Sequence, residues 1–352
     1  MNSATVEIPR SARDDSRDTL VDVRDLRVQF NLDEGTVKAV DGATFDIRRG
    51  ETLGIVGESG CGKSMTARSI LRIVARPGRI VGGQILYHRD GKVIDLAQLD
   101  PHGDEIRAIR GAEIAMIFQE PMTSFSPVHT IGNQIVEAIL LHQSVSKDQA
   151  RSIAIEALRR VGMSRPQQRI DQYPHELSGG MRQRAMIAMA MACNPTLLIA
   201  DEPTTALDVT TQAQILELMR DLKRDTGAGI LMITHDLGVV AEMAQRVAVM
   251  YLGRVVETAD VRSLYRDPKH PYTQALMRSI PKIGRGARER LEPVKGMVPS
   301  PYNRPRGCPF HTRCPAFMPG KCDRIVPTPV QVDEGRTVEC LLYGGGVPID
   351  GQ

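Results

Sequence analysis

The sequence predicts an α/β fold in which a largely parallel sheet, covered by helices, leads into a phosphate-binding loop. Residues 57–64 read GESGCGKS and match G-x-x-x-x-G-K-S/T, a glycine-rich loop that opens a helix. Short apolar runs at residues 113–119, 196–201 and 229–234 are typical of parallel strands buried on both faces. Helical patterns alternate with these runs, as in an α/β protein.

The chain has 352 residues, 41% of them hydrophobic and 25% charged, which suits one large domain with a smaller addition. Its net charge of +3 gives no electrostatic reason to expect nucleic acid as a partner. No run approaches the roughly 18–20 apolar residues that a membrane-spanning helix needs. Residues 1–19 are polar and lack the apolar core of a secretory signal, so we expect a disordered leader and a cytoplasmic protein.

The first half of the chain contains the elements that lead into and out of this loop. Alternating residues from 20 to 49 predict antiparallel strands with a turn at 33–35, forming an edge sheet. Residues 51–57 (ETLGIVG) predict a buried strand, and residues 63–74 (KSMTARSILRIV) a helix.

Beyond the loop, residues 130–174 predict a helical insertion, since Ile131, Ile135, Ile139 and Leu140 recur at helical spacing. The composition changes after residue 261, so we place a boundary near residue 263. The basic run at 285–290 is interpreted as a solvated loop.

The phosphate loop predicts a nucleotide site with magnesium. Its glycines let the backbone wrap a polyphosphate, while Lys63 neutralises the β- and γ-oxygens and Ser64 offers its hydroxyl to Mg²⁺. Asp201, which ends an apolar strand, is the expected acidic partner of that ion. The predicted nucleotide-binding residues of the loop are Gly57, Glu58, Ser59, Gly60, Cys61, Gly62, Lys63 and Ser64.

Three further residues are candidates for catalysis. Glu202 follows Asp201 at a strand end, so it can face the attacking water as a general base. Gln119 ends another strand and could orient water or metal, and His235 closes the strand-like GILMIT near the expected γ-phosphate. Without the phosphate loop, Glu202 would be a surface acid about as often as a general base, and His235 would more often be a structural histidine.

Ser178, Gly179 and Gly180 form a second candidate anion site, because they open the helix beginning MRQRAMIAMA. A chain with a phosphate loop and another anion-binding helix end predicts a dimer. Each nucleotide would then lie between the loop of one subunit and the LSGGM segment at 177–181 of the other.

Together, the loop, Gln119, LSGGM, DEPTTALD at 201–208 and His235 resemble the ATP-binding subunits of ABC transporters over about residues 20–260. GIVGESGCGKS, FQEPMTSFSPVHTIGNQI, HPYTQALMRSIP and CPFHTRCP resemble, more narrowly, the oligopeptide and dipeptide importer ATPases. This implies a P-loop NTPase of ABC type with an antiparallel β edge subdomain, a helical signature subdomain and a small cysteine-containing C-terminal extension. The implied divisions are 20–262 for the ATPase, with its helical subdomain at about 120–180, and 263–352 for the extension.

The resemblance also implies roles and partners. Phe30 would stack on adenine, Asp208 would belong to the D-loop at a dimer interface, Gln119 would join the Mg²⁺ site, and Ser178 and Gly180 would contact ATP in trans. Partners would be two transmembrane permeases, a second ATPase subunit, identical or paralogous, and an extracytoplasmic solute-binding protein. The chain would sit on the cytoplasmic face of the inner membrane, with residues 120–126 receiving a permease coupling helix.

Four of the six cysteines crowd into the C-terminal tract with spacing C-x₅-C-x₇-C-x₁₇-C. A reducing cytoplasm disfavours disulfides, and residue chemistry leaves zinc and an iron–sulfur cluster about equally open, with disulfides or free thiols as a less favoured alternative. Resemblance to the peptide importer ATPases favours a 4Fe–4S cluster, with Zn²⁺ as the alternative. The expected ligands are Cys308, Cys314, Cys322 and Cys340.

We therefore predict the ATP-hydrolysing subunit of an ABC importer that powers peptide uptake. One alternative is a soluble ABC ATPase acting on nucleic acid or ribosomes, which would be expected to have tandem ATPase domains, a long coiled coil or a strongly basic surface. Another is a binding-only regulatory subunit, against which the intact Glu202 and His235 argue. The transported solute is not determined by the sequence.

Overall fold

The computed structural model describes residues 18–119, 124–205, 207–279 and 294–349. Most of the expected leader, the basic run at 285–290 and residues 120–123 lie outside this range. The chain forms two compact units. The first, called here the helical unit, contains Asp46–Thr52 and Ile85–Ile233 with the residues up to Asp22. The second, the C-terminal unit, contains Val23–Phe45, Leu53–Gln84 and Thr234–Gln352.

The predicted edge hairpin is present. The strands β1 (Thr19–Leu32) and β2 (Gly35–Arg48) are neighbours joined by two residues, at the expected turn. β4 (Gly78–Arg89) lies on the other side of β1. Its end pairs antiparallel with β5 (Lys92–Asp95) in the helical unit.

The helical unit has a parallel core of three strands, as the apolar runs predict. β6 (Ile114–Ile117), β7 (Leu197–Asp201) and β8 (Gly229–Ile233) pair in parallel, and every residue in them is buried. This burial on both faces explains why these segments lack polar alternation. The other elements of this unit are η2 (Leu96–Gln98), α2 (Asp104–Ile109) and α8 (Val209–Thr226).

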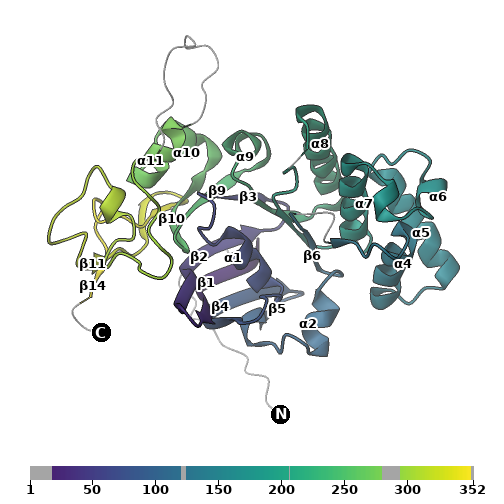
Figure 1. The fold of residues 1–352 in the computed structure, drawn as a ribbon, viewed down its shortest axis with the longest axis horizontal. Coiled ribbons are helices and arrows are strands. Elements are labelled where there is room, and N and C mark those ends of the chain that lie inside the picture. Colours follow the sequence, from purple (N-terminus) through teal and green to yellow (C-terminus); the bar gives the residue numbers. More distant parts are fainter. Residues whose placement is uncertain (1–17, 120–123, 206, 280–293, 350–352) are drawn as a thin grey trace, which may run out of the picture. The chain divides into compact units, whose positions relative to one another are not determined.

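The expected helical insertion is also present. It comprises α4 (Ile131–His142), α5 (Lys147–Arg160), α6 (Pro166–Arg169), η3 (Pro174–Glu176) and α7 (Gly179–Met191). The helices α4, α5 and α7 pack on one another (Figure 1). Ile131, Ile135 and Ile139 are buried in this packing, whereas Leu140 is 40% exposed and is not part of the apolar stripe. α5 begins with a capping box between Ser146 and Gln149, which satisfies backbone donors at its start.

The helix α1 (Lys63–Ile70) ends earlier than predicted. The apolar spacing continues to Val74, but Arg72 has a φ of 56°, in the left-handed region where a helix cannot continue. The backbone therefore leaves the helix at Leu71 although the hydrophobic pattern persists.

In the C-terminal unit, β3 (Thr52–Val56) pairs in parallel with β9 (Arg246–Tyr251), and β10 (Arg254–Asp260) pairs antiparallel with β9. A late hairpin of β12 (Val330–Asp333) and β13 (Arg336–Val338) then joins β10. This pairing was not predicted. The remaining elements are α9 (Leu237–Met243), α10 (Val261–Arg266), α11 (Pro271–Arg278), η4 (His311–Arg313), β11 (Ile325–Val326) and β14 (Val347–Pro348).

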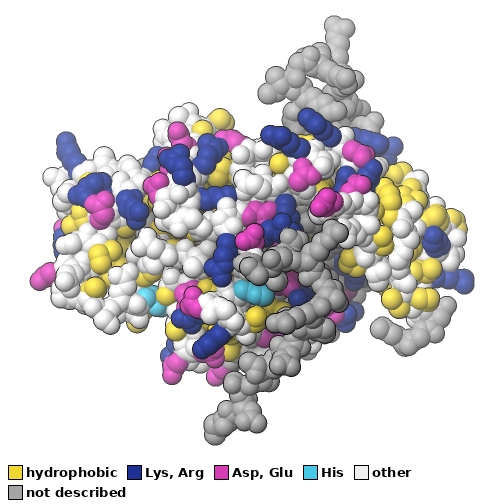
Figure 2. Space-filling view, turned by 180° about the vertical axis from the view of Figure 1, so that it is seen from behind, with side chains coloured by type: hydrophobic (Ala, Val, Ile, Leu, Met, Phe, Trp, Pro, Cys, Tyr) yellow, Lys and Arg dark blue, Asp and Glu magenta, His cyan; other side chains and the backbone are white. Residues whose placement is uncertain are grey.

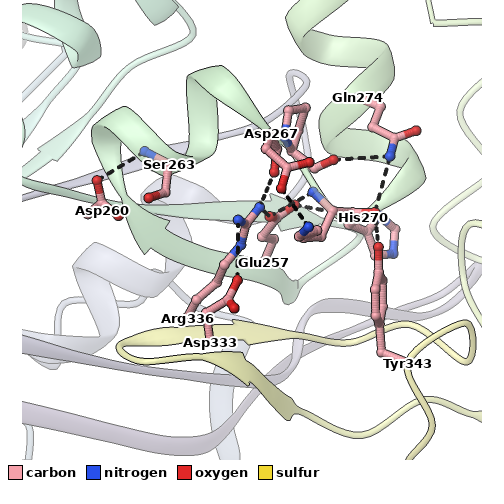
Figure 3. Close-up of polar contacts among 11 residues, drawn as sticks. Glu257, Asp260, Ser263, Asp267, His270, Gln274, Asp333, Arg336 and Tyr343 are labelled. Atoms are coloured by element: carbon pink, nitrogen blue, oxygen red, sulfur yellow. Dashed lines mark hydrogen bonds and ion pairs between the residues drawn. The ribbon is translucent and has the colours of Figure 1, made fainter.

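A buried ion pair fastens the late hairpin to β10 (Figure 3). Glu257 on β10 is 1% exposed, and its carboxylate accepts a 2.6 Å hydrogen bond from Arg336 on β13. The same carboxylate accepts from the backbone N–H groups of Lys269 and His270, just before α11. One carboxylate thus joins β10 and the start of α11 to β13, which lies 79 residues further along the chain.

Among the described residues, no helix is long and apolar enough to cross a membrane. On the face drawn in Figure 2, basic and acidic side chains are intermixed rather than gathered by sign. That mixture agrees with the small net charge and provides no single-sign stripe on this face for a nucleic-acid backbone.

Candidate functional site

The phosphate loop, residues 57–64, follows the buried strand β3 and opens α1. Gly57, Gly60 and Gly62 all have positive φ, at 155°, 76° and 103°. A Cβ on Gly57 would lie 2.1 Å from the carbonyl oxygen of Met250, and one on Gly62 would lie 2.3 Å from that of Ala39. Neighbouring main chain therefore leaves no room for side chains at these two positions, and the loop can curve tightly.

Lys63 lies across this loop. Its side chain is buried, and Nζ donates to the carbonyl oxygens of Gly57 at 2.8 Å and Glu58 at 3.1 Å. Cys61 is also buried, and burial raises the pKa of its thiol, so the thiol stays protonated at neutral pH. The ammonium group is thus held inside the curve that the sequence predicts for phosphate oxygens.

Two residues far along the chain hold Glu58 in this loop. The hydroxyl of Tyr272 accepts a 2.9 Å hydrogen bond from the Glu58 N–H, and Arg313 donates to both Glu58 carboxylate oxygens, at 2.7 and 3.0 Å. Neither residue was predicted from the sequence. Tyr272 lies in HPYTQALMRSIP and Arg313 in CPFHTRCP, two segments that carried the resemblance, but neither of these two residues was assigned a role.

In the helical unit, the structure brings Gln119 and Glu202 together. Glu202 Oε2 accepts from Gln119 Nε2 at 3.0 Å and from the Thr205 hydroxyl at 2.9 Å. Glu202 has a φ of 49°, and its N–H donates to the Ile233 carbonyl at 2.8 Å. Its direction therefore comes from a left-handed turn after β7 rather than from strand alternation, the reason used in the sequence analysis. Asp201, the last residue of β7, is fully buried.

The starts of α7 and α8, at the LSGGM and DEPTTALD segments, contact each other within this unit. Ser178 caps α7 and accepts from the Met181 N–H, while Asp208 caps α8 and accepts from the N–H and hydroxyl of Thr211. A Cβ on Gly180 would lie 2.9 Å from the Thr211 methyl carbon. The hydrogen bonds from Thr211 lower the pKa of Asp208, so this carboxylate stays ionised. Ser178, Gly179 and Asp208 are exposed, and so remain accessible at these two helix starts.

Two further predicted residues lie in the C-terminal unit. His235 is exposed, two residues after the end of β8, and the next residue, Asp236, caps α9 by accepting from the N–H groups of Gly238 and Val239. Phe30 is half-buried on β1, and a Cβ on Gly78 would lie 2.5 Å from its ring. Gly78 thus lies directly against the Phe30 ring.

All four C-terminal cysteines line one cavity, together with His270 and Phe310. Cys308, Cys322 and Cys340 are buried, Cys314 is partly buried, and all four are free thiols. Burial raises the pKa of Cys308 to about 12, and the three neighbouring thiols act in the same direction. Within the described ranges, no group of three or more potential ligands lies close enough to hold a single metal ion.

Comparison with known families gives two matches. Residues 40–205 match the family described as ABC transporter, and residues 256–322 match the family described as oligopeptide/dipeptide transporter, C-terminal region.

Individual relatives match over nearly their whole length. The oligopeptide transport ATP-binding protein AppD of Bacillus subtilis is 51% identical over 92% of this chain and 97% of its own, and the dipeptide transport ATP-binding protein DppD of that organism is 47% identical over 92% and 94%. A solved dimeric ATP-binding cassette, MJ0796 bound to ADP and phosphate, is 27% identical with a TM-score of 0.61, covering 69% of this chain and 99% of that one.

Proposed function

Because this chain belongs to the ATP-binding subunits of ABC transporters, in the branch with the oligopeptide/dipeptide C-terminal region, we propose that it hydrolyses ATP to power peptide uptake. One observation carries the substrate class. Relatives named for oligopeptide and dipeptide transport match more than nine-tenths of the chain, including the C-terminal region as well as the ATPase part. No relative reported above favours the nucleic-acid alternative.

For ATP and magnesium we propose the roles that the motifs indicate. Lys63 binds the β- and γ-phosphates, Phe30 stacks on adenine, and Ser64, Gln119 and Asp201 provide oxygen ligands for Mg²⁺. This donor set fits the ion, because Mg²⁺ takes oxygen ligands from one or two carboxylates and from substrate phosphates and keeps several waters. When bound, the ion neutralises charge on the phosphates.

For hydrolysis we propose Glu202 as the residue that takes a proton from the attacking water. Support comes from its two hydrogen bonds, since Gln119 and Thr205 both donate to the same carboxylate oxygen and so fix its direction. Gln119 then orients the water, and His235 acts at the γ-phosphate.

The assembly that we propose is a dimer of ATPase subunits beneath two permeases, fed by an extracytoplasmic binding protein. The exposed Ser178 and Gly179, with Gly180, would meet the nucleotide of the partner subunit, and Asp208 would lie at the shared interface. The dimeric state of MJ0796 supports this arrangement. The chain would lie peripherally on the cytoplasmic face of the membrane, with residues 20–262 as the ATPase domain and 263–352 as the extension.

Reconstitution tests this function. The chain is combined with its two permeases and partner ATPase in liposomes, and accumulation of a labelled dipeptide and a labelled pentapeptide is measured with the binding protein present. We expect accumulation of at least one peptide that requires enclosed MgATP and stops when the chain is omitted. No ATP-dependent accumulation of either peptide would contradict the proposal.

For the cysteines, we propose a 4Fe–4S cluster bound by Cys308, Cys314, Cys322 and Cys340. Support comes from their convergence on one cavity and from the thiolate ligands that such clusters take. The same four thiolates could instead hold Zn²⁺, which is the alternative. When bound, the cluster would cross-link the extension.

Metal analysis of anaerobically purified protein tests the cluster. We expect brown protein with about four irons and four sulfides per chain. Replacing Cys322 by Ser should lower both contents, whereas replacing Cys193, which lies outside the tract, should not. Colourless protein with one zinc per chain would contradict the cluster and support the alternative.

A further inference from the structure

The cysteine tract, residues 308–340, contacts the phosphate loop directly through Arg313. Arg313 lies in η4, immediately before Cys314, and its guanidinium binds both carboxylate oxygens of Glu58. The two residues are 255 positions apart in the chain. The arginine side chain is only 3% exposed and that of Glu58 is 24% exposed, so water screens this pair less than a surface pair.

Arg313 is fixed on its other sides as well. Its guanidinium carbon lies 5.8 Å from the centre of the Tyr251 ring and 5.9 Å from that of Phe310, within cation–π distance. Nε donates to the carbonyl oxygen of Lys295 at 3.1 Å. These contacts direct the fork of donors toward Glu58, so little side-chain freedom remains to be lost when the pair forms.

The same region of the chain also holds the Glu58 backbone. Tyr272, whose hydroxyl accepts from the Glu58 N–H, is fully buried, and its ring lies 4.6 Å from that of Tyr251 and 5.4 Å from that of Phe310. Phe310 itself belongs to the cysteine tract. The aromatic cluster of Tyr251, Tyr272 and Phe310 therefore holds in place both groups that hydrogen-bond to Glu58, which are the Tyr272 hydroxyl and the guanidinium of Arg313.

The negative charge of Glu58 links its pairing with Arg313 to nucleotide binding. Glu58 is the second residue of a loop that we propose binds a polyphosphate, so an unpaired carboxylate there would repel the ligand. A bidentate guanidinium offsets that charge and keeps the carboxylate turned toward the extension. The loop can then present its N–H groups and Lys63 to an anion.

We propose that Arg313 is a positioning residue for ATP binding, which neutralises and orients Glu58 so that the cysteine tract maintains the anion-binding form of the phosphate loop. This inference rests on the proposed function. Order in the cysteine tract thereby contributes to affinity for MgATP.

Equilibrium binding of MgATP to the purified full-length chain tests this, with Arg313→Gln, Glu58→Gln and the double variant. Arg313→Gln should weaken binding about tenfold, within the range of coupling between contacting residues. Adding Glu58→Gln should restore most of that loss, because no unpaired carboxylate remains. Arg324→Gln, at an exposed arginine of the same tract, is the matched control and should bind like the wild type.

Arg313→Lys keeps the charge but loses the planar fork, and should fall between the wild type and Arg313→Gln. Circular dichroism and thermal melting establish that each variant is folded, and Arg313→Lys takes the place of Arg313→Gln if that variant does not fold. A merely structural role would lower melting temperature without the rescue by Glu58→Gln. Wild-type affinity in both Arg313 variants, or a double variant no tighter than Arg313→Gln, would overturn the inference. A wild-type chain that binds no MgATP would instead contradict the proposed function.

Discussion

Tyr272 shows how one hydroxyl group can serve a distant loop. It is fully buried, and its oxygen accepts the Glu58 N–H, so removing it would leave a backbone donor without this partner. The ring itself packs in the aromatic cluster with Tyr251 and Phe310. A substitution by phenylalanine therefore removes the hydroxyl and leaves the ring in place.

We predict that Tyr272→Phe lowers the free energy of unfolding by about 1 kcal/mol, the net contribution of a typical hydrogen bond, because the part-buried bond to the Glu58 N–H is lost. Urea unfolding monitored by circular dichroism measures it. The matched control is Tyr343→Phe, since that hydroxyl binds the Lys269 carbonyl at the surface and its loss should cost less than about 0.5 kcal/mol. Equal effects of the two substitutions would contradict the assigned role.

His270 at the start of α11 predicts a pH dependence. It is 1% exposed, and burial lowers its pKa from 6.5 to about 3. Between pH 6.5 and pH 3 the folded protein therefore binds fewer protons at His270 than the unfolded chain does. The neutral His270 thus contributes to the free energy of unfolding in full above pH 6.5, and this contribution is lost as the pH falls toward 3. Acidification from pH 7 to pH 5 should therefore lower the free energy of unfolding by about 2 kcal/mol.

Unfolding of the wild type and of His270→Gln at the two pH values tests this. Glutamine can still accept from the Tyr272 N–H, as the His270 Nδ1 does, but does not titrate. The wild type should lose about 2 kcal/mol more than the variant on acidification. Identical losses would show that His270 is not the titrating group.

At the scale of elements, the phosphate loop depends on close approach of main chain at particular glycines. Gly62 and Gly60 both have positive φ, but a Cβ on Gly62 would strike the Ala39 carbonyl oxygen, whereas one on Gly60 would meet nothing within 4 Å. A side chain would therefore strain the backbone at both positions, but only at Gly62 would it also clash with neighbouring main chain.

Gly62→Ala should therefore destabilise the chain by about 2–5 kcal/mol, combining backbone strain with overpacking. Gly60→Ala should cost about 1–2 kcal/mol, from strain alone. Chemical denaturation of both variants gives the comparison. If Gly60→Ala were as destabilising as Gly62→Ala, the contact with Ala39 would not limit the loop.

Local patterns predicted much of the fold because they reflect local physics. Apolar runs identified β6, β7 and β8, and helical spacing identified α4. The end of α1 was wrong, since periodicity does not report the left-handed turn at Arg72. The hydrogen bond between Gln119 and Glu202, and the pairs Glu257–Arg336 and Arg313–Glu58, join residues 79 or more positions apart, and no spacing in one sequence encodes such pairings.

At the scale of the whole molecule, the segment that matches the oligopeptide/dipeptide transporter C-terminal region contacts the phosphate loop directly. Within the C-terminal unit, β13 joins the strand β10, and Tyr272 and Arg313 hold the phosphate loop. Two matched families, one for the cassette and one for the C-terminal region, thus meet in one compact unit. By our proposal, loss of order in this segment should accordingly weaken MgATP binding.

The central claim, that this chain splits ATP through Glu202, is tested most directly by steady-state phosphate release from the assembled transporter carrying Glu202→Gln. Glu217→Gln, at an exposed acid on α8, is the matched control. We predict that release falls at least about 100-fold in Glu202→Gln, the contribution of a general base, while MgATP binding and the control stay at the wild-type level. Undiminished phosphate release from Glu202→Gln would contradict the account.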